Sequence, residues 1–64
     1  MVDTNKLRGI IAERGTTQNK VAESIGITPK TFYAKMKKRV FGTDEIEKMM
    51  SVLNIEDVSI FFGH

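Results

Sequence analysis

The stretch that decides the fold is residues 17–39, TQNKVAESIGITPKTFYAKMKKR. It predicts two short helices joined by a tight turn at Gly26, because glycine accepts the positive φ that such a turn requires. The second helix opens with Thr28 and Pro29. Threonine caps a helix N-terminus, and proline fits the first turn, where its missing N–H costs no hydrogen bond. This arrangement is typical of a helix-turn-helix.

Helical periodicity divides the second helix of this stretch into two faces. Phe32 and Met36 are predicted to point inward, since residues four apart share a face. Lys35 lies at the border, where its methylenes can cover the core while its ammonium extends outward. The positions on the opposite side are Lys30, Ala34 and Lys37, with Tyr33 and Lys38 flanking them.

Apolar periodicity predicts three further helices, so the expected fold class is all-α with five short helices. One spans about residues 4–14 and another residues 43–54, the latter capped by its first residue, Thr43. The last spans about residues 56–62. In the connection before the fourth helix, Val40 and Phe41 are expected to tuck under the domain.

Length and composition limit the possible classes of function. A chain of 64 residues predicts one domain, residues 1–64. There is no cysteine, and the only histidine is His64, so we expect no disulfide, metal site or cofactor. No apolar run approaches the ~20 residues of a membrane span, and the N-terminus has no apolar signal core. We therefore expect a soluble cytoplasmic protein.

The charge of the chain is modest in total but unevenly distributed. The net charge is +2, yet residues 28–39 carry five basic side chains and no acid. Residues 40–64 carry five acids and a single lysine. A clustered basic face is typical of a protein that binds a polyanion. A solvated lysine-rich helix face is the alternative interpretation.

The acids of the fourth predicted helix do not indicate catalysis. Asp44 and Glu45 stand in its first turn, where the helix dipole favours negative charge, and Glu47 is interpreted as part of a solvated face. Without a cysteine, a usable histidine cluster or a glycine-rich phosphate loop, the sequence does not predict an enzyme.

Residues 18–36 resemble the helix-turn-helix of the phage Cro and repressor family. The matching residues are Gln18, Val21, Ala22, Ile25, Gly26, Ile27 and Phe32. The run TFYAKMKK after the Thr-Pro cap is similar to the recognition helix of small phage-encoded regulators, and the resemblance extends over nearly the whole chain. The family usually has an apolar residue where this chain has Lys35, and Met36 supplies the bulk one position later. The resemblance implies a lambda-repressor-like domain with its motif at about residues 17–38.

The resemblance also implies a partner, double-stranded DNA, with the second helix of the motif in the major groove. The residues expected to read bases are Thr28, Lys30, Tyr33, Ala34 and Lys37. Those expected to contact phosphate are Thr17, Gln18, Lys38 and Arg39. Two of these assignments have alternatives. Gln18 can be simply solvent-exposed, and Tyr33 can reach a phosphate or pack against the flank of its helix.

The C-terminal segment carries more apolar residues than one small core needs, so Ile60, Phe61 and Phe62 are candidates for a dimer surface. The leading hypothesis is a sequence-specific DNA-binding transcriptional regulator, encoded by a phage or prophage and acting as a homodimer. The alternative is a protein-interaction module, such as an anti-repressor or modulator. That module would keep the fold and act through its acidic fourth helix and apolar C-terminus.

Overall fold

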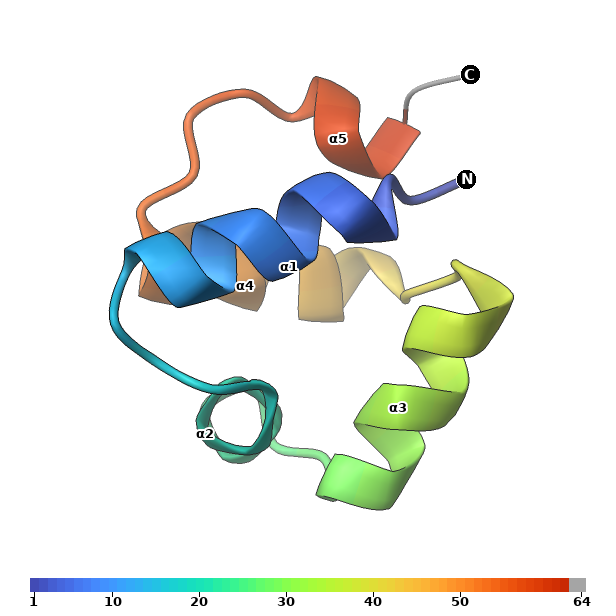
Figure 1. Ribbon diagram of the computed structural model, residues 1–64. Coiled ribbons are helices and arrows are strands. Elements are labelled where there is room, and N and C mark those ends of the chain that lie inside the picture. Colours follow the sequence, from blue (N-terminus) through green and yellow to red (C-terminus); the bar gives the residue numbers. More distant parts are fainter. Residues whose placement is uncertain (63–64) are drawn as a thin grey trace.

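The computed structural model describes residues 1–62, which form five helices and no strand (Figure 1). This confirms the predicted all-α class. The helices are α1 (Thr4–Glu13), α2 (Gln18–Ser24), α3 (Pro29–Lys38), α4 (Thr43–Leu53) and α5 (Ser59–Phe62). His64, and with it the end of the expected domain 1–64, lies outside the described residues.

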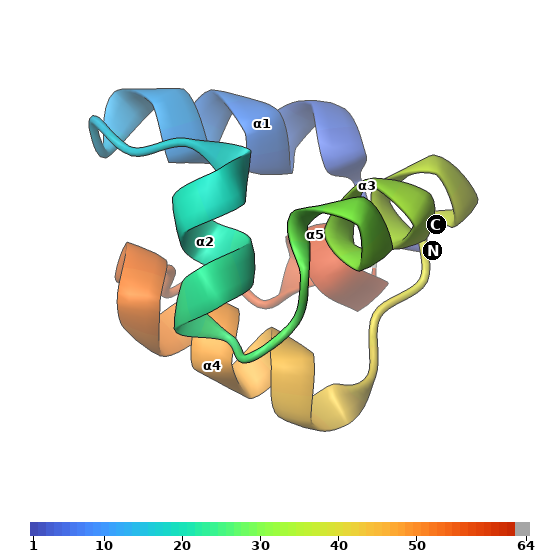
Figure 2. The ribbon, with the colours of Figure 1, turned by 90° about the horizontal axis from the view of Figure 1, so that it is seen from below.

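The helices are arranged around α2, which packs against α1, α3 and α4, while α5 packs against α1. In Figure 1, α1 crosses the middle of the molecule with α4 behind it, and α2 is seen end-on below them. Seen from below, α2 and α3 lie in front, with α4 and α5 behind them (Figure 2). The two helices of the predicted motif therefore occupy one side of the molecule.

The core anchors α3 through its two predicted inward residues. Phe32 is fully buried and Met36 is 3% exposed. The Phe32 ring lies 5.4 Å from that of Phe41, which closes the core from the connection after α3. Burying a side chain of this size contributes about 1.5–3 kcal/mol. The inward positions predicted from periodicity are confirmed, and they fix which face of α3 remains outside.

The turn between α2 and α3 follows the predicted local rules. Thr17 and Thr28 cap the two helices, each accepting a hydrogen bond from the backbone N–H three residues later at 3.2 Å. Gly26 has a φ of +83°, and Ile27 donates its N–H to the Ala22 carbonyl at 3.0 Å. These bonds satisfy groups that a helix end would otherwise leave unpaired.

The start of α4 differs from the sequence prediction. Gly42, not Thr43, is the N-cap residue, and its N–H donates to Glu45 Oε1 at 2.7 Å. A carboxylate three residues inside the helix thus replaces the expected threonine cap. Val40 is 62% exposed, so only Phe41 of the connecting pair tucks under the domain.

The C-terminal helix is shorter than predicted, and only one of the three expected surface residues on it is exposed. It begins at Ser59, whose N–H donates to Asp57 Oδ1 at 2.9 Å. Hydrogen bonds from the Ser59 side chain and backbone lower the pKa of Asp57. Ile60 and Phe61 are buried, whereas Phe62 is exposed. Two of the three residues of the expected dimer surface, Ile60 and Phe61, therefore lie in the core of this chain.

Backbone hydrogen bonds join the N-terminal residues to α5 and to the end of α3. The Val2 N–H donates to the Arg39 carbonyl at 3.0 Å, and the Asp3 N–H donates to the Ile60 carbonyl at 2.6 Å. They tie the ends of α3 and α5 to the start of the chain. Within residues 1–62, no helix is long and apolar enough to cross a bilayer.

Candidate nucleic-acid interface

The outer face of α3 carries the residues expected to read bases, and the structure leaves all of them exposed. They are Thr28, Lys30, Tyr33, Ala34 and Lys37. The two core residues of α3 hold its opposite face, and residues advance around a helix by about 100° each. Lys30, Ala34 and Lys37 consequently share the middle of the exposed surface.

The residues expected to contact phosphate lie at two ends of the motif. Thr17 caps α2, and Gln18, the first residue of α2, is half-buried. Lys38 and Arg39 are exposed at the end of α3. The four phosphate-contact residues therefore do not form one cluster: one pair lies at the start of α2 and the other at the end of α3. In the sequence, the base-reading residues lie between the two pairs.

Arg39 has an unusual backbone conformation for an arginine. Its φ of +59° puts it in the left-handed region, where it ends α3. Glycine is the usual residue there, because a side chain costs roughly 1–2 kcal/mol in that conformation. A guanidinium is thus displayed beside Lys38 at a position where glycine would be less strained.

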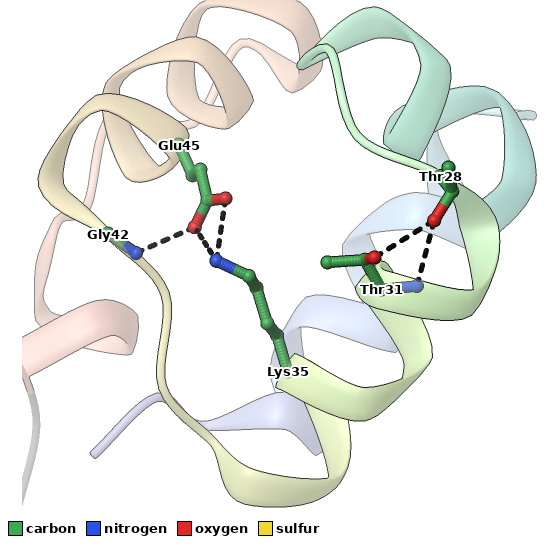
Figure 3. A network of polar contacts seen from close by, with 5 residues as sticks. All are labelled: Thr28, Thr31, Lys35, Gly42 and Glu45. Atoms are coloured by element: carbon green, nitrogen blue, oxygen red, sulfur yellow. Dashed lines mark hydrogen bonds and ion pairs between the residues drawn. The ribbon is translucent and has the colours of Figure 1, made fainter.

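Lys35 does not belong to the exposed basic face. Its Nζ lies 2.8 Å from both carboxylate oxygens of Glu45, as Figure 3 shows. The expectation that its ammonium extends outward is corrected, because Glu45 at the start of α4 reaches the border of α3. The exposed cations between residues 28 and 39 are then Lys30, Lys37, Lys38 and Arg39. Within residues 1–62, none of these four forms an ion pair.

The Glu45 carboxylate links α4, on which it lies, to Lys35 on α3 and to Gly42 in the connection between the two helices. Burial alone would raise its pKa, but hydrogen bonds from Lys35 and from the Gly42 N–H, with the charges of Lys35 and Lys48, lower the pKa below its ordinary value. The Glu45 side chain is 16% exposed and that of Lys35 is 32% exposed. This half-buried pair fixes α3 against the start of α4, and its role is structural.

The hydroxyl of Thr28 is engaged within the protein. It accepts the Thr31 N–H at 3.2 Å and donates to Thr31 Oγ1 at 2.9 Å (Figure 3). Its proton is therefore not available to a base, and its methyl group is the part that can contact one. Thr31, which the sequence did not single out, is exposed and keeps a hydroxyl proton to donate.

Tyr33 is joined to α2 by a hydrogen bond that the sequence did not predict. Its hydroxyl donates to Asn19 Oδ1 at 2.5 Å, and both residues are exposed. The Tyr33 ring meets the Phe32 ring edge-on, with centroids 6.4 Å apart. Asn19 shows no periodic or motif signal. Only its place near the start of α2, where a polar side chain stays exposed, could have marked it.

The described residues also bear on whether the protein could bind a metal ion. Residues 1–62 contain no group of three or more His, Asp or Glu side chains placed to bind a metal ion. The outer face of α3 carries hydrogen-bond donors and positive charge on a helix, a combination that attracts anions.

Comparison with known protein families gives a match over nearly the whole chain. The family described as "Protein of unknown function (DUF739)" matches residues 1–63. No curated protein and no solved structure matches the chain.

Proposed function

The chain belongs to the DUF739 family of proteins of unknown function, and we propose that it is a sequence-specific DNA-binding transcriptional regulator. The observation that carries the proposal is the outer face of α3. There Lys30, Lys37, Lys38 and Arg39 stand exposed without acidic partners among the described residues. The resemblance of residues 18–36 to the phage Cro and repressor helix-turn-helix supports it, and favours a phage or prophage regulator acting in the cytoplasm.

In the proposed complex, α3 lies in the major groove and α2 crosses the backbone. Lys30 and Lys37 donate to guanine O6 and N7, and Ala34 meets a thymine methyl. Lys38 and Arg39, at the end of α3, bind phosphate, with Thr17 and Gln18 at the start of α2. The burial of Phe32 and Met36 supports these roles, because a helix anchored on one face holds the other in a fixed orientation.

The positive charge of this face predicts a strong salt dependence. The logarithm of the affinity falls as the logarithm of the salt concentration rises, and each cation that neutralises a phosphate on duplex DNA makes this slope steeper by about 0.9. Lys35 adds nothing in this proposal, because Glu45 already neutralises it.

We also propose that the protein acts as a homodimer on a two-fold operator, whose half-sites would lie about 34–36 Å apart. Phe62 is the exposed member of the expected dimer surface, and Val58, four residues before it in the sequence, is 47% exposed. Sedimentation equilibrium tests this part. A monomer at high concentration that binds a single half-site tightly would contradict it.

Selection from random duplexes tests the proposed function. The wild-type protein should enrich a short palindrome, and Lys30→Ala or Lys37→Ala should relax the preference at individual positions. Lys48→Ala is the matched control, since Lys48 is an exposed lysine on α4 without an ion pair among residues 1–62. Weak, salt-labile binding without enrichment would refute the proposal and favour a protein-interaction module.

A further inference from the structure

The hydrogen bond between α2 and α3 limits what Tyr33 can recognise. The Tyr33 hydroxyl donates to Asn19 Oδ1 at 2.5 Å, which is at the short end of the range for O–H···O bonds. A phenol carries one proton, and here Asn19 accepts it. The Tyr33 oxygen, on an exposed side chain, retains only acceptor capacity toward any outside partner.

Because the Tyr33 hydroxyl can only accept a hydrogen bond, it can bond to some groups of duplex DNA and not to others. Phosphate oxygens, guanine O6 and N7, and thymine O4 are acceptors, so they cannot bond to a hydroxyl whose proton is already committed. The donors in the major groove are the exocyclic amino groups of adenine, at N6, and of cytosine, at N4. Every base pair contains one adenine or one cytosine, so the strand matters. An acceptor at Tyr33 matches adenine or cytosine on the strand that it faces, and it does not match guanine or thymine on that strand.

We infer that Asn19 is a positioning residue that makes Tyr33 an acceptor for the exocyclic amino group of adenine or cytosine at one position of each half-site. The inference rests on the proposed function and names a specificity determinant within it. It excludes the phosphate contact considered for Tyr33. It also gives Asn19 a second task, because its two amide protons remain free for a backbone phosphate.

Base analogues test the inference directly. At the position that depends on Tyr33, replacing adenine by purine, or cytosine by 2-pyrimidinone, removes the amino group and leaves the ring. Wild-type affinity should then fall about tenfold, within the range expected for a base contact. The affinity of Tyr33→Phe for the two duplexes should be equal, because phenylalanine has no acceptor.

The variant Asn19→Ala tests whether Asn19 orients the Tyr33 hydroxyl or only packs against its side chain. Alanine is a good helix former, so the variant should fold, and circular dichroism checks this. Freed from Asn19, the Tyr33 hydroxyl can donate, and the preference at the same position should relax toward guanine or thymine. The double variant Asn19→Ala/Tyr33→Phe should match Tyr33→Phe alone. Lys38→Ala is the control, because it should leave the preference at this position unchanged.

The possible outcomes are distinguishable. If the base that depends on Tyr33, on the strand identified by the analogue substitutions, is guanine or thymine, the inference is overturned and the proposed function stands. The same follows if Asn19→Ala leaves the preference unchanged, or if Tyr33→Phe still discriminates the analogue. If the wild-type protein enriches no sequence at all, the proposed function fails and the inference fails with it.

Discussion

Removing the Glu45 carboxylate should loosen the contact between α3 and α4. Glu45 makes two 2.8 Å contacts to Lys35 Nζ and accepts the Gly42 N–H at 2.7 Å. Exposed ion pairs contribute up to about 1 kcal/mol, and breaking a buried one costs about 3–5 kcal/mol. This half-buried pair lies between the two. Glu45→Ala should therefore lower the free energy of unfolding by about 2 kcal/mol, and Glu45→Gln, which keeps an acceptor for Gly42, by about 1 kcal/mol.

Urea denaturation followed by circular dichroism measures these losses. A cycle of Glu45→Gln, Lys35→Met and the double variant isolates the pair, and we expect a coupling of about 1 kcal/mol at neutral pH. A change of 1 kcal/mol corresponds to roughly 4–8 °C in Tm for a domain of this size. Glu47→Gln is the matched control, because Glu47 is an exposed acid on the same helix without an ion pair among residues 1–62. Its effect should stay within about 0.5 kcal/mol.

The same coupling should depend on pH in one direction. The pKa of Glu45 in the folded protein lies below its ordinary value of 4.5. A lowered pKa stabilises the fold fully above the unfolded value, and the contribution disappears as the pH falls through the folded value. The coupling should therefore be complete above about pH 5 and fade in more acidic solution. Zero coupling at neutral pH, or coupling that persists after the carboxylate is protonated, would refute this account of Lys35.

Four further predictions concern charge and backbone conformation. Lys38→Ala should reduce the slope of log affinity against log salt by about 1, whereas Lys35→Ala should leave it unchanged; salt titrations of DNA binding decide this. Gly26→Ala should destabilise the fold by roughly 1 kcal/mol, because its φ is +83°. Gly9→Ala should stabilise it by up to about 1 kcal/mol, since Gly9 lies inside α1 and nothing lies within 4 Å of an added Cβ. Thermal unfolding measures both glycine variants. Arg39→Gly should raise Tm by relieving the left-handed strain and weaken DNA binding. A loss of stability with unchanged affinity would contradict both expectations.

The helix-turn-helix stretch was predictable because its signals are local. Thr28 caps its own helix, Gly26 supplies the turn from its own backbone freedom, and Phe32 and Met36 follow helical periodicity. Each of these depends on neighbours within about four residues in the chain, which a sequence displays directly.

The side-chain contacts between helices could not be predicted from the sequence, because they depend on how the helices pack in space. The ion pair of Lys35 with Glu45 and the hydrogen bond of Tyr33 with Asn19 join residues 10 and 14 positions apart. No periodicity relates such positions. Ile60 likewise lies in the core and accepts a backbone hydrogen bond from Asp3, at the other end of the chain. The sequence therefore indicated the exposed face of α3 and overestimated the charge on it.

The central proposal is that the exposed face of α3 recognises a specific DNA sequence. The most direct measurement compares the affinities of the wild-type protein and Lys30→Ala for the selected duplex and for random duplexes. The proposal predicts that Lys30→Ala loses about 1–3 kcal/mol on the selected duplex and much less on random DNA. Equal losses on both, or a wild-type protein that does not distinguish them, would contradict it.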